Sequence, residues 1–329
     1  MSTAVVPTSS SPAFTVVKPG LLSLLQDAGR VGYHSMGLTN GGPIDAESFY
    51  WANRLCSENV AEKKLTAIEI TLGGLELGCH INTVIAVAGA DIPFSINGKA
   101  KSLWRGHRVS VGDKLAFGFV ANAEQGCRAY LAVAGGFDVP RSFGSSATVV
   151  REGIGGLDGE ALAAGDVLSA SSSPQPMQLW RLAEQHRLQC SDVLTLRVVC
   201  GYQFEQFSQQ AIQDFFAGEY ELSPRSDRMG FCLQGPVIDS GITNLISEGI
   251  SYGAIQITTE GQLIILLNDR QTIGGYPKLG AVFSLDLARL AQRGHGANIC
   301  FTPLELSQAQ RLLREHQQHR ATIELQPVA

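Results

Sequence analysis

The sequence predicts a mainly β protein with a few helices, long enough for about two domains. Three observations support this prediction: 36 glycines and 13 prolines among 329 residues, an aromatic content of 7%, and a charged content of 17%. Frequent glycine and proline are typical of a chain that turns often between short strands. An apolar content of 44% with a net charge of −5 excludes disorder for most of the chain.

The N-terminal half is expected to consist mostly of short strands. Residues 1–13 are rich in Ser, Thr and Pro and predict a mobile tail. Ala67–Leu72 alternates between apolar and polar residues, whereas Thr83–Ala88 is a continuous apolar run typical of a buried strand. Ile92–Ile96 leads into Asn97-Gly98, a strong signal for a tight hairpin.

One helix interrupts these strands. Asp45 is a suitable N-cap for a helix over 46–56, with Phe49, Ala52 and Cys56 on one face.

A short internal repeat has the form L/V-x-x-G-D-x-L, at Val109–Leu115 and again at Leu162–Leu168. Gly-Asp between two apolar strand segments indicates a turn at a barrel corner, so we assign both copies a structural role.

The segment 171–176, Ser-Ser-Ser-Pro-Gln-Pro, is the best candidate for a linker. After it, the sequence predicts strands at 194–199, around Cys232, at 254–257 and at 263–267, and helices over 204–216 and 285–292. Thr302-Pro303-Leu304-Glu305 is a capping-box pattern that predicts a final helix reaching about His319.

Charge and cysteine usage narrow the class of protein. A pI near 5.8 argues against nucleic acid or an anionic membrane as the main partner. The cysteines lie at least ten residues apart, so they form no C-x-x-C metal or redox pair and indicate reduced thiols. No basic residue precedes Lys18, and the longest apolar runs are only strand-sized. We therefore expect a cytoplasmic protein with no membrane span.

Most strong catalytic motifs are absent. There is no P-loop, no H-E-x-x-H and no G-x-S-x-G, and the glycines of 153–159 miss the G-x-G-x-x-G spacing. The seven histidines are scattered, so no metal site is predicted.

Three polar clusters embedded in glycine are the candidates for chemistry. They occupy 26–53, 226–230 and 253–278. Glycine lets a backbone approach a ligand closely, and arginine presents a planar fork to a carboxylate or carbonyl group. The first two clusters are also explained by turns with local caps or ion pairs. The third is harder to explain as a plain loop, because five polar residues, 268–272, directly follow an apolar strand.

The chain resembles the allophanate hydrolase subunit 2 family of biotin-dependent carboxyltransferase-like proteins, which includes the C subunit of bacterial ATP-dependent 5-oxoprolinase. The resemblance covers about residues 14–302 and is carried by Gln-Asp-Ala-Gly-Arg-Val-Gly at 26–32, Gly-Gly-Pro-Ile-Asp-Ala at 41–46, Ala-Val-Ala-Gly-Gly-Phe at 132–137, Ser-Asp-Arg-Met-Gly at 226–230, Ile-Ser-Glu-Gly at 246–249, Gly-Ala-Ile-Gln at 253–256 and Asp-Arg-Gln-Thr-Ile-Gly-Gly-Tyr-Pro-Lys at 269–278. One departure is Ser146, where the family more usually has arginine.

The resemblance implies two cyclophilin-like β-barrel subdomains with a site in the cleft between them. We expect the first carboxyltransferase-like subdomain over 14–176 and the second, with the terminal helix, over 177–329. The resemblance also implies two partner proteins. One is a homologue of the 5-oxoprolinase B subunit, which is similar to allophanate hydrolase subunit 1, and the other is a homologue of the A subunit.

The hypothesis is that the complex opens 5-oxoproline, a cyclic amide, to glutamate. ATP would act at the level of the complex. The candidate catalytic residues are Asp227, Arg228, Asp269, Arg270 and Lys278. An arginine or Lys278 would bind a carboxylate or phosphoryl group and offset oxyanion charge, and an aspartate would act as general base or orient an arginine. The candidate substrate-binding residues are Asp27, Arg30, Asp45, Asn53, Ser226, Gln256, Gln271, Thr272, Gly274, Gly275 and Tyr276.

Two alternatives remain open. The first is biotin-dependent carboxyl transfer of the urea carboxylase type, using a separate biotin carrier. The second is a binding module without enzymatic activity that antagonises a kinase inhibitor, itself the homologue of the B subunit.

Overall fold

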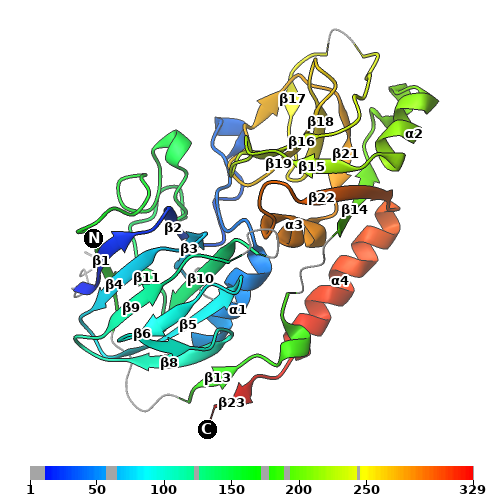
Figure 1. Cartoon of the computed structure of the whole chain (residues 1–329). Coiled ribbons are helices and arrows are strands. Elements are labelled where there is room, and N and C mark those ends of the chain that lie inside the picture. The colour runs from blue at the N-terminus through cyan, green and yellow to red at the C-terminus, as the bar shows by residue number, and fades with distance from the viewer. Residues whose placement is uncertain are drawn as a thin grey trace, which may run out of the picture.

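The computed structural model describes residues 12–56, 65–121, 126–171, 178–188, 193–242 and 245–328. Figure 1 shows two β-rich halves, with a long C-terminal helix running along one side of both. The prediction of a mainly β fold with a few helices is confirmed. The first strand begins at Pro12, so Pro12 and the buried Ala13 belong to a strand and not to the expected tail. The remainder of the tail and most of the expected linker lie outside the described residues.

The N-terminal half contains two seven-stranded sheets. One has the order β11 (Phe137–Asp138), β12 (Val167–Ala170), β1 (Pro12–Pro19), β4 (Leu75–Cys79), β9 (Lys114–Phe117), β6 (Phe94–Ile96) and β7 (Lys99–Lys101). The other has the order β2 (Leu22–Gln26), β3 (Ala67–Thr71), β10 (Arg128–Val133), β5 (Thr83–Gly89), β8 (Arg105–Val109), β13 (Trp180–Arg181) and β23 (Gln326–Pro327).

The central strands of the second sheet are buried on both faces. On one face, Ile68, Ile85 and Leu131 join the core that the two sheets share. On the other face, Ala86 and Tyr130 pack beneath α1 (Ala46–Cys56). Because side chains alternate along a strand, a helix on the outer face lets polar positions of β3 become buried as well.

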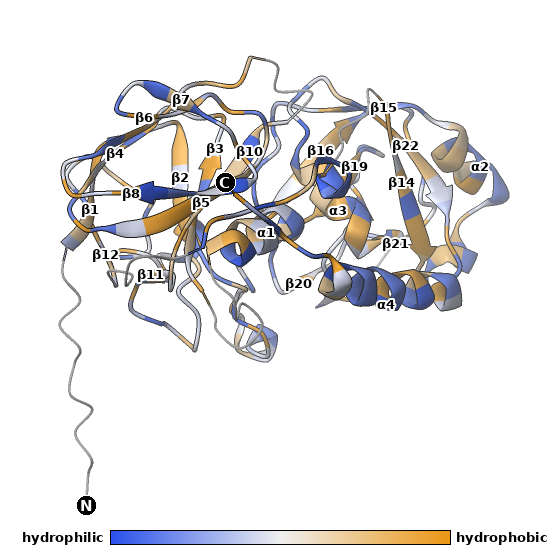
Figure 2. Ribbon diagram, turned by 90° about the horizontal axis from the view of Figure 1, so that it is seen from below, coloured by the Kyte–Doolittle hydropathy of each residue, from blue (hydrophilic) through white to orange (hydrophobic). Residues whose placement is uncertain are grey.

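The C-terminal half is a closed barrel. Its order is β14 (Val193–Cys200), β21 (Lys278–Val282), β18 (Ala254–Ile257), β19 (Leu263–Leu266), β16 (Gly230–Gln234), β15 (Tyr220–Leu222) and β22 (Asn298–Pro303). A small flap of β17 (Glu248–Gly249) and β20 (Ile273–Gly274) is paired separately. The other helices are α2 (Gln209–Ala217), α3 (Ser284–Ala291) and α4 (Leu306–Thr322), with 3-10 turns at His34–Met36, Val150–Glu152, Glu184–His186 and Phe204–Gln206. Figure 2 shows apolar residues along the strands, whereas α4 is largely hydrophilic.

Several local predictions are confirmed. The carboxylate of Asp45 accepts hydrogen bonds from the backbone N–H groups of Glu47 and Ser48, both at 3.0 Å, and so caps α1. Asn97 and Gly98 both have positive φ, 52° and 74°, as a tight hairpin between β6 and β7 requires.

The two copies of the internal repeat are turns of the same design. Asp113 accepts from the Ser110 N–H and Asp166 from the Ala163 N–H, both at 2.8 Å, which supports their structural assignment.

Two helix predictions need correction. The helix expected over 204–216 begins only at Gln209, because Ser208 accepts from the Ala211 N–H and caps it there. The capping box at Thr302–Glu305 does not form. Thr302 and Pro303 instead pair with β14, and α4 begins after Glu305 without a side-chain cap.

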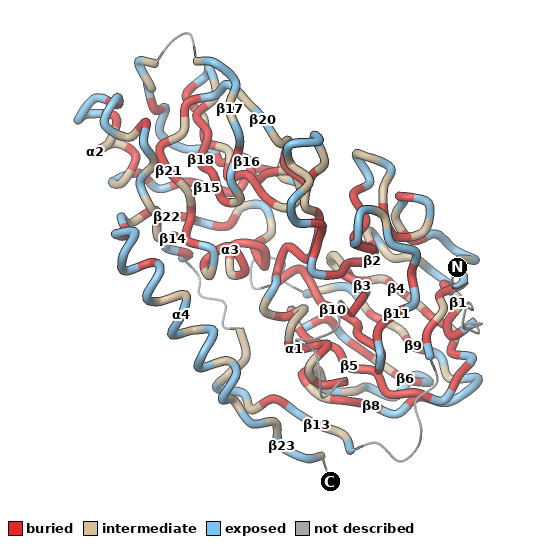
Figure 3. The backbone as a smooth tube through the Cα atoms, turned by 180° about the vertical axis from the view of Figure 1, so that it is seen from behind, coloured by how far each residue is buried: buried red, intermediate tan, exposed pale blue. Residues whose placement is uncertain are grey.

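The boundary between the halves is not a simple cut at residue 176. β13 pairs with β8, and β23 pairs in turn with β13, so the segment near Trp180 and the C-terminal strand join the N-terminal sheet. Helix α4 connects the barrel to this strand, and it is mostly exposed (Figure 3). No helix in the described part of the chain is long and apolar enough to cross a membrane.

Candidate functional site

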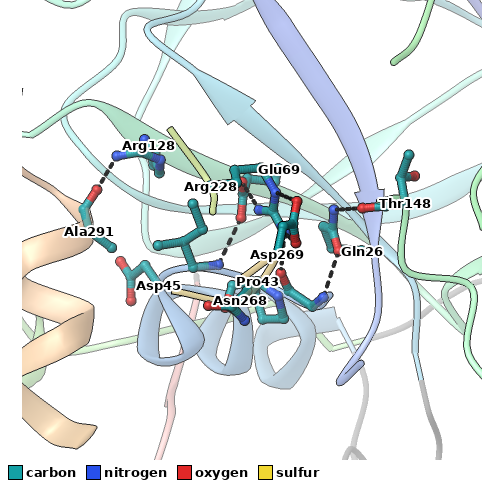
Figure 4. Close-up of polar contacts among 12 residues, drawn as sticks. Gln26, Pro43, Asp45, Glu69, Arg128, Thr148, Arg228, Asn268, Asp269 and Ala291 are labelled. Atoms are coloured by element: carbon teal, nitrogen blue, oxygen red, sulfur yellow. Dashed lines mark hydrogen bonds and ion pairs between the residues drawn. The ribbon is translucent and has the colours of Figure 1, made fainter. Parts of the chain in front are cut away.

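A buried arginine joins the two halves (Figure 4). Arg228, just before β16, donates to both oxygens of Asp269 at 2.9 and 3.0 Å, and to Glu69 Oε1 of β3 at 2.6 Å. It also donates to the carbonyl oxygen of Gly42 at 2.7 Å. Asn268 adds bonds from its side chain to the carbonyl oxygens of Gly41 and Pro43. The three glycine-rich clusters therefore meet at this junction.

The electrostatics of the junction favour a structural role for Arg228. Burial lowers the pKa of Arg228, but Glu69 and Asp269 raise it by more, so the guanidinium stays charged. Burial raises the pKa of Glu69, but Arg228 and Arg128, together with hydrogen bonds from Tyr130 and the Ile44 N–H, hold this pKa below its usual value. Burial raises the pKa of Asp269 despite its arginine partner. Both oxygens of Asp269 accept hydrogen bonds from Arg228. Of the two predicted roles of Asp269, the geometry therefore favours orienting an arginine and not acting as a general base.

A second junction lies around Gln292, directly after α3. Its Oε1 accepts from the backbone N–H groups of Cys127 and Arg128, and its Nε2 donates to Asp45 Oδ2 at 2.6 Å. Asp45 is completely buried, and its other oxygen caps α1. The geometry thus assigns Asp45 to the contact between the halves.

Asp45 has a testable pH dependence. Burial raises its pKa to about 6, from 3.8 in the unfolded chain. Because the folded state holds this proton more tightly, the contribution of Asp45 to stability falls as pH rises from about 4 to about 6. Relative to the Asp45→Asn variant, the free energy of unfolding of the wild type should fall by about 3 kcal/mol across this window. Urea unfolding of both proteins at each pH measures the difference, and a difference that stays constant from acid to neutral pH would contradict the expectation.

Asp27 and Arg30 hold the loop at 142–148. Asp27 accepts from Ser145 Oγ at 2.5 Å and from the Ser146 N–H at 3.0 Å. Arg30 is buried and donates to the carbonyl oxygen of Ala147 at 2.7 Å. Ser146, at the position of the expected arginine, is buried and bonded to Thr66 Oγ1 at 2.6 Å. These contacts favour a structural function for Asp27 and Arg30, which were predicted to bind substrate.

Three further candidates lie in local structure. The Ser226 hydroxyl group accepts from the Cys232 N–H across a turn. Asp227 is exposed, and its carboxylate accepts from the N–H groups of Met229 and Gly230. Asn53 is buried within α1 and donates to the carbonyl oxygen of Phe49. The structure does not bring any of these three into the same group as the flap residues.

Arg270 differs from Arg228 in its partners. It donates to the carbonyl oxygens of Ile250 and Leu267 at 3.0 and 3.1 Å, and to Asn40 Oδ1 at 3.2 Å. Its Cζ lies 5.8 Å from the centroid of the Tyr252 ring. Among the described residues, no carboxylate forms an ion pair with Arg270, so this buried positive charge is not neutralised. Burial lowers its pKa.

A buried amide lies beside the flap. Gln256 of β18 is 1% exposed, and its Nε2 has no hydrogen-bond partner within the described part of the chain. A Cβ added at Gly274 would lie 3.2 Å from this atom, 3.5 Å from Gln271 Nε2 and 2.7 Å from Ile250 Cδ1. Only glycine at this position therefore allows the flap to lie so close to the two amides.

A charged network borders the flap, and of its members only Lys278 was predicted from the sequence. Lys278 forms an ion pair with Glu248, which also accepts from the Tyr202 hydroxyl group. Gln203 donates to Glu248 at 2.8 Å and accepts from the Lys278 N–H at 2.7 Å. Glu248 lies within the Ile-Ser-Glu-Gly motif, and that motif was the only signal in the sequence that pointed to it.

The remaining predicted residues belong to the flap itself. The carbonyl oxygen of Thr272 accepts from the Ile250 N–H at 3.0 Å, while Gly275 and Tyr276 are exposed. We define the flap site as Arg270, Gln256, Gln271, Lys278 and Glu248. It combines an unneutralised guanidinium, amide donors and an ion pair, which suit an anionic ligand with a carbonyl group.

Comparison with known proteins identifies related chains. Residues 36–303 match the family model described as carboxyltransferase domain, subdomain A and B. The chain is 31% identical to the 5-oxoprolinase C subunit of Escherichia coli over 307 residues, which cover 92% of this chain and 95% of that protein. It is 33% identical to urea amidolyase of Lachancea kluyveri, covering 93% of this chain but only 18% of that protein.

Solved structures are similar over most of the chain. The urea carboxylase of Kluyveromyces lactis superimposes with a TM-score of 0.86 and 31% identity, covering 96% of this chain and 29% of that one. The protein TTHA0988 superimposes with a TM-score of 0.78 and 31% identity, covering 90% of this chain and 57% of that one.

Proposed function

The chain belongs to the carboxyltransferase domain family, subdomains A and B, and from this premise we propose that it is the C-type component of an ATP-dependent 5-oxoprolinase. The extent of the similarity supports this assignment. The chain corresponds to 95% of the C subunit of the Escherichia coli enzyme but to less than a fifth of urea amidolyase. The reaction opens the lactam ring of 5-oxoproline to glutamate.

The observation that carries the proposal is the unneutralised charge of Arg270. 5-Oxoproline bears one carboxylate and one lactam carbonyl group. A buried guanidinium without a carboxylate partner is suited to bind that carboxylate, because bidentate arginine–carboxylate pairs are strong and directional. Arg228 is not available for this role, since Glu69 and Asp269 already neutralise it.

In this proposal Gln256 contacts the lactam. Its unpartnered Nε2 is a hydrogen-bond donor to the carbonyl oxygen, on which negative charge develops when the ring is attacked. Ile250 contacts both parts of the site, because its carbonyl oxygen accepts from Arg270 and its Cδ1 is close to Gly274, beside Gln256. The two anchoring groups thus share Ile250 as a neighbour, which suits a small bifunctional ligand.

Lys278 and Glu248 form an ion pair at the flap. The ion pair with Lys278, together with the Tyr202 hydroxyl group, lowers the pKa of Glu248. The pair holds the Lys278 ammonium group in a fixed position beside the flap, and we assign Lys278 a positioning role.

The complete reaction requires partners in this proposal. ATP supplies the free energy for ring opening, and the sequence has no P-loop to bind it on this chain. Homologues of the A and B subunits would therefore complete the enzyme, in the cytoplasm.

Reconstitution tests the proposal. The purified chain, combined with its A-type and B-type partner proteins, is expected to release glutamate from 5-oxoproline only when ATP is present. Removing this chain should abolish turnover, and avidin should have no effect. Turnover that continues without this chain would refute the assignment.

The Gln256→Leu variant tests the site within the same assay. Losing one donor to the developing oxyanion should lower kcat by roughly 10²-fold. The matched control is Gln234→Leu, at an exposed end of β16, which should retain wild-type turnover. Equal rates for both variants would remove Gln256 from the site.

Carboxyl transfer is the second candidate function. The family match and the similarity to urea carboxylase support it. In that case the complex would need a biotin carrier from another chain, and avidin would abolish activity.

A further inference from the structure

A cavity that Tyr252 borders is not used by the proposed reaction. It has a volume of about 440 Å³ and lies between α1, α3 and α4. Figure 1 shows α4 running past α3 toward the N-terminal half. The volume falls within the range of roughly 300–1,000 Å³ that is usual for ligand pockets.

The walls of the cavity are mainly apolar. Ile44, Leu188, Tyr252, Leu285 and Leu313 line it. The guanidinium of Arg270 lies over the ring of Tyr252, so one aromatic side chain borders both the cavity and the flap site.

The acidic residues of the cavity are already neutralised. Asp286 is buried and accepts two bonds from the guanidinium of Arg197, at 2.9 and 2.5 Å. Glu47 lies 3.1 Å from His316 Nε2 and 3.4 Å from Arg320 Nη1.

Among the residues that the structure describes, one arginine of the cavity has no partner. Three arginines, Arg197, Arg289 and Arg320, face two carboxylates around the cavity. Arg289 of α3 is half-buried, and its guanidinium forms no hydrogen bond or ion pair with any residue that the structure describes. A single unpaired guanidinium at an apolar wall is complementary to one carboxylate attached to an apolar chain.

We propose that this cavity is a second ligand site, which binds a small amphipathic monocarboxylate. Its carboxylate pairs with Arg289 and its hydrocarbon part packs against the apolar wall. A second negative charge is disfavoured, because the other two arginines are occupied by Glu47 and Asp286.

Calorimetric titration of the complete chain with hexanoate tests the site. Saturable binding of one hexanoate per chain is expected, and hexan-1-ol, which lacks the charge, should bind at least tenfold more weakly. Absence of saturable binding, or equal affinity for the alcohol, would overturn the proposal.

Variants locate the site. Arg289→Gln should weaken hexanoate binding at least tenfold, whereas Arg289→Lys, which keeps the charge, should stay within a few-fold of the wild type. Arg311→Gln is the matched control, because Arg311 is exposed on α4 and does not line the cavity. Wild-type affinity in the Arg289→Gln variant would place the ligand elsewhere and overturn the assignment. Urea unfolding of each variant verifies that it is folded.

Discussion

Replacing Arg228 with alanine is expected to lower the free energy of unfolding by about 3–5 kcal/mol. The substitution leaves two buried carboxylates, Glu69 and Asp269, without the guanidinium that neutralises both of them. It also removes the bond to the Gly42 carbonyl oxygen, which connects the barrel to the N-terminal half. Urea denaturation followed by far-UV circular dichroism measures the loss.

The matched control is Arg225→Ala. Arg225 is exposed three residues earlier in the same loop, so its loss should change stability by less than about 0.5 kcal/mol. If the two variants unfold at the same urea concentration, the junction does not stabilise the fold in the way that its contacts indicate. A partial recovery is expected when Asp269→Asn is added to Arg228→Ala, because one buried charge is then removed.

Replacing Arg270 with alanine should lower the kcat/KM of the reconstituted complex for 5-oxoproline by roughly 10²–10³-fold, as expected when one partner of a buried charge pair is removed. The proposed role of Arg270 is to bind the substrate carboxylate, so most of the loss should appear as a higher KM. Ring opening measured by ATP-dependent glutamate release gives both constants. Arg270→Lys keeps the charge but not the planar fork, and should recover only part of the loss.

Stability must be measured in parallel, because Arg270 also donates to the carbonyl oxygens of Ile250 and Leu267. Arg225→Ala serves again as the control and should retain wild-type kinetics. Unaltered turnover in a folded Arg270→Ala variant would exclude this residue from the site.

Local features were predictable because short-range chemistry decides them. Asp45 caps α1 and Asn97-Gly98 forms a tight hairpin, since each depends on residues a few positions away. The prediction of a capping box at Thr302–Glu305 was wrong because a long-range contact decides the structure there. Pairing of Thr302 with β14, more than 100 residues earlier, outweighed the local helix signal.

Part of the candidate site was predictable from the sequence. Arg270, Gln256 and Lys278 all came from the glycine-rich clusters, and the structure places them around one flap. Glu69 was missed, because an alternating strand predicts that its polar positions face solvent. In the folded chain, β3 is covered on both faces, and Glu69 points into the junction with Arg228.

The sequence by itself therefore determined the β-rich class, the local turns and caps, and the loops in which polar residues gather. Only the tertiary structure decided which of those polar residues form hydrogen bonds and ion pairs with one another. Arg228 and Arg270 lie in similar glycine-flanked contexts, yet folding brings two carboxylates to Arg228, whereas the described partners of Arg270 are neutral. The physical reason is that neutralising a buried charge depends on strands and loops distant in the sequence, which no local pattern records.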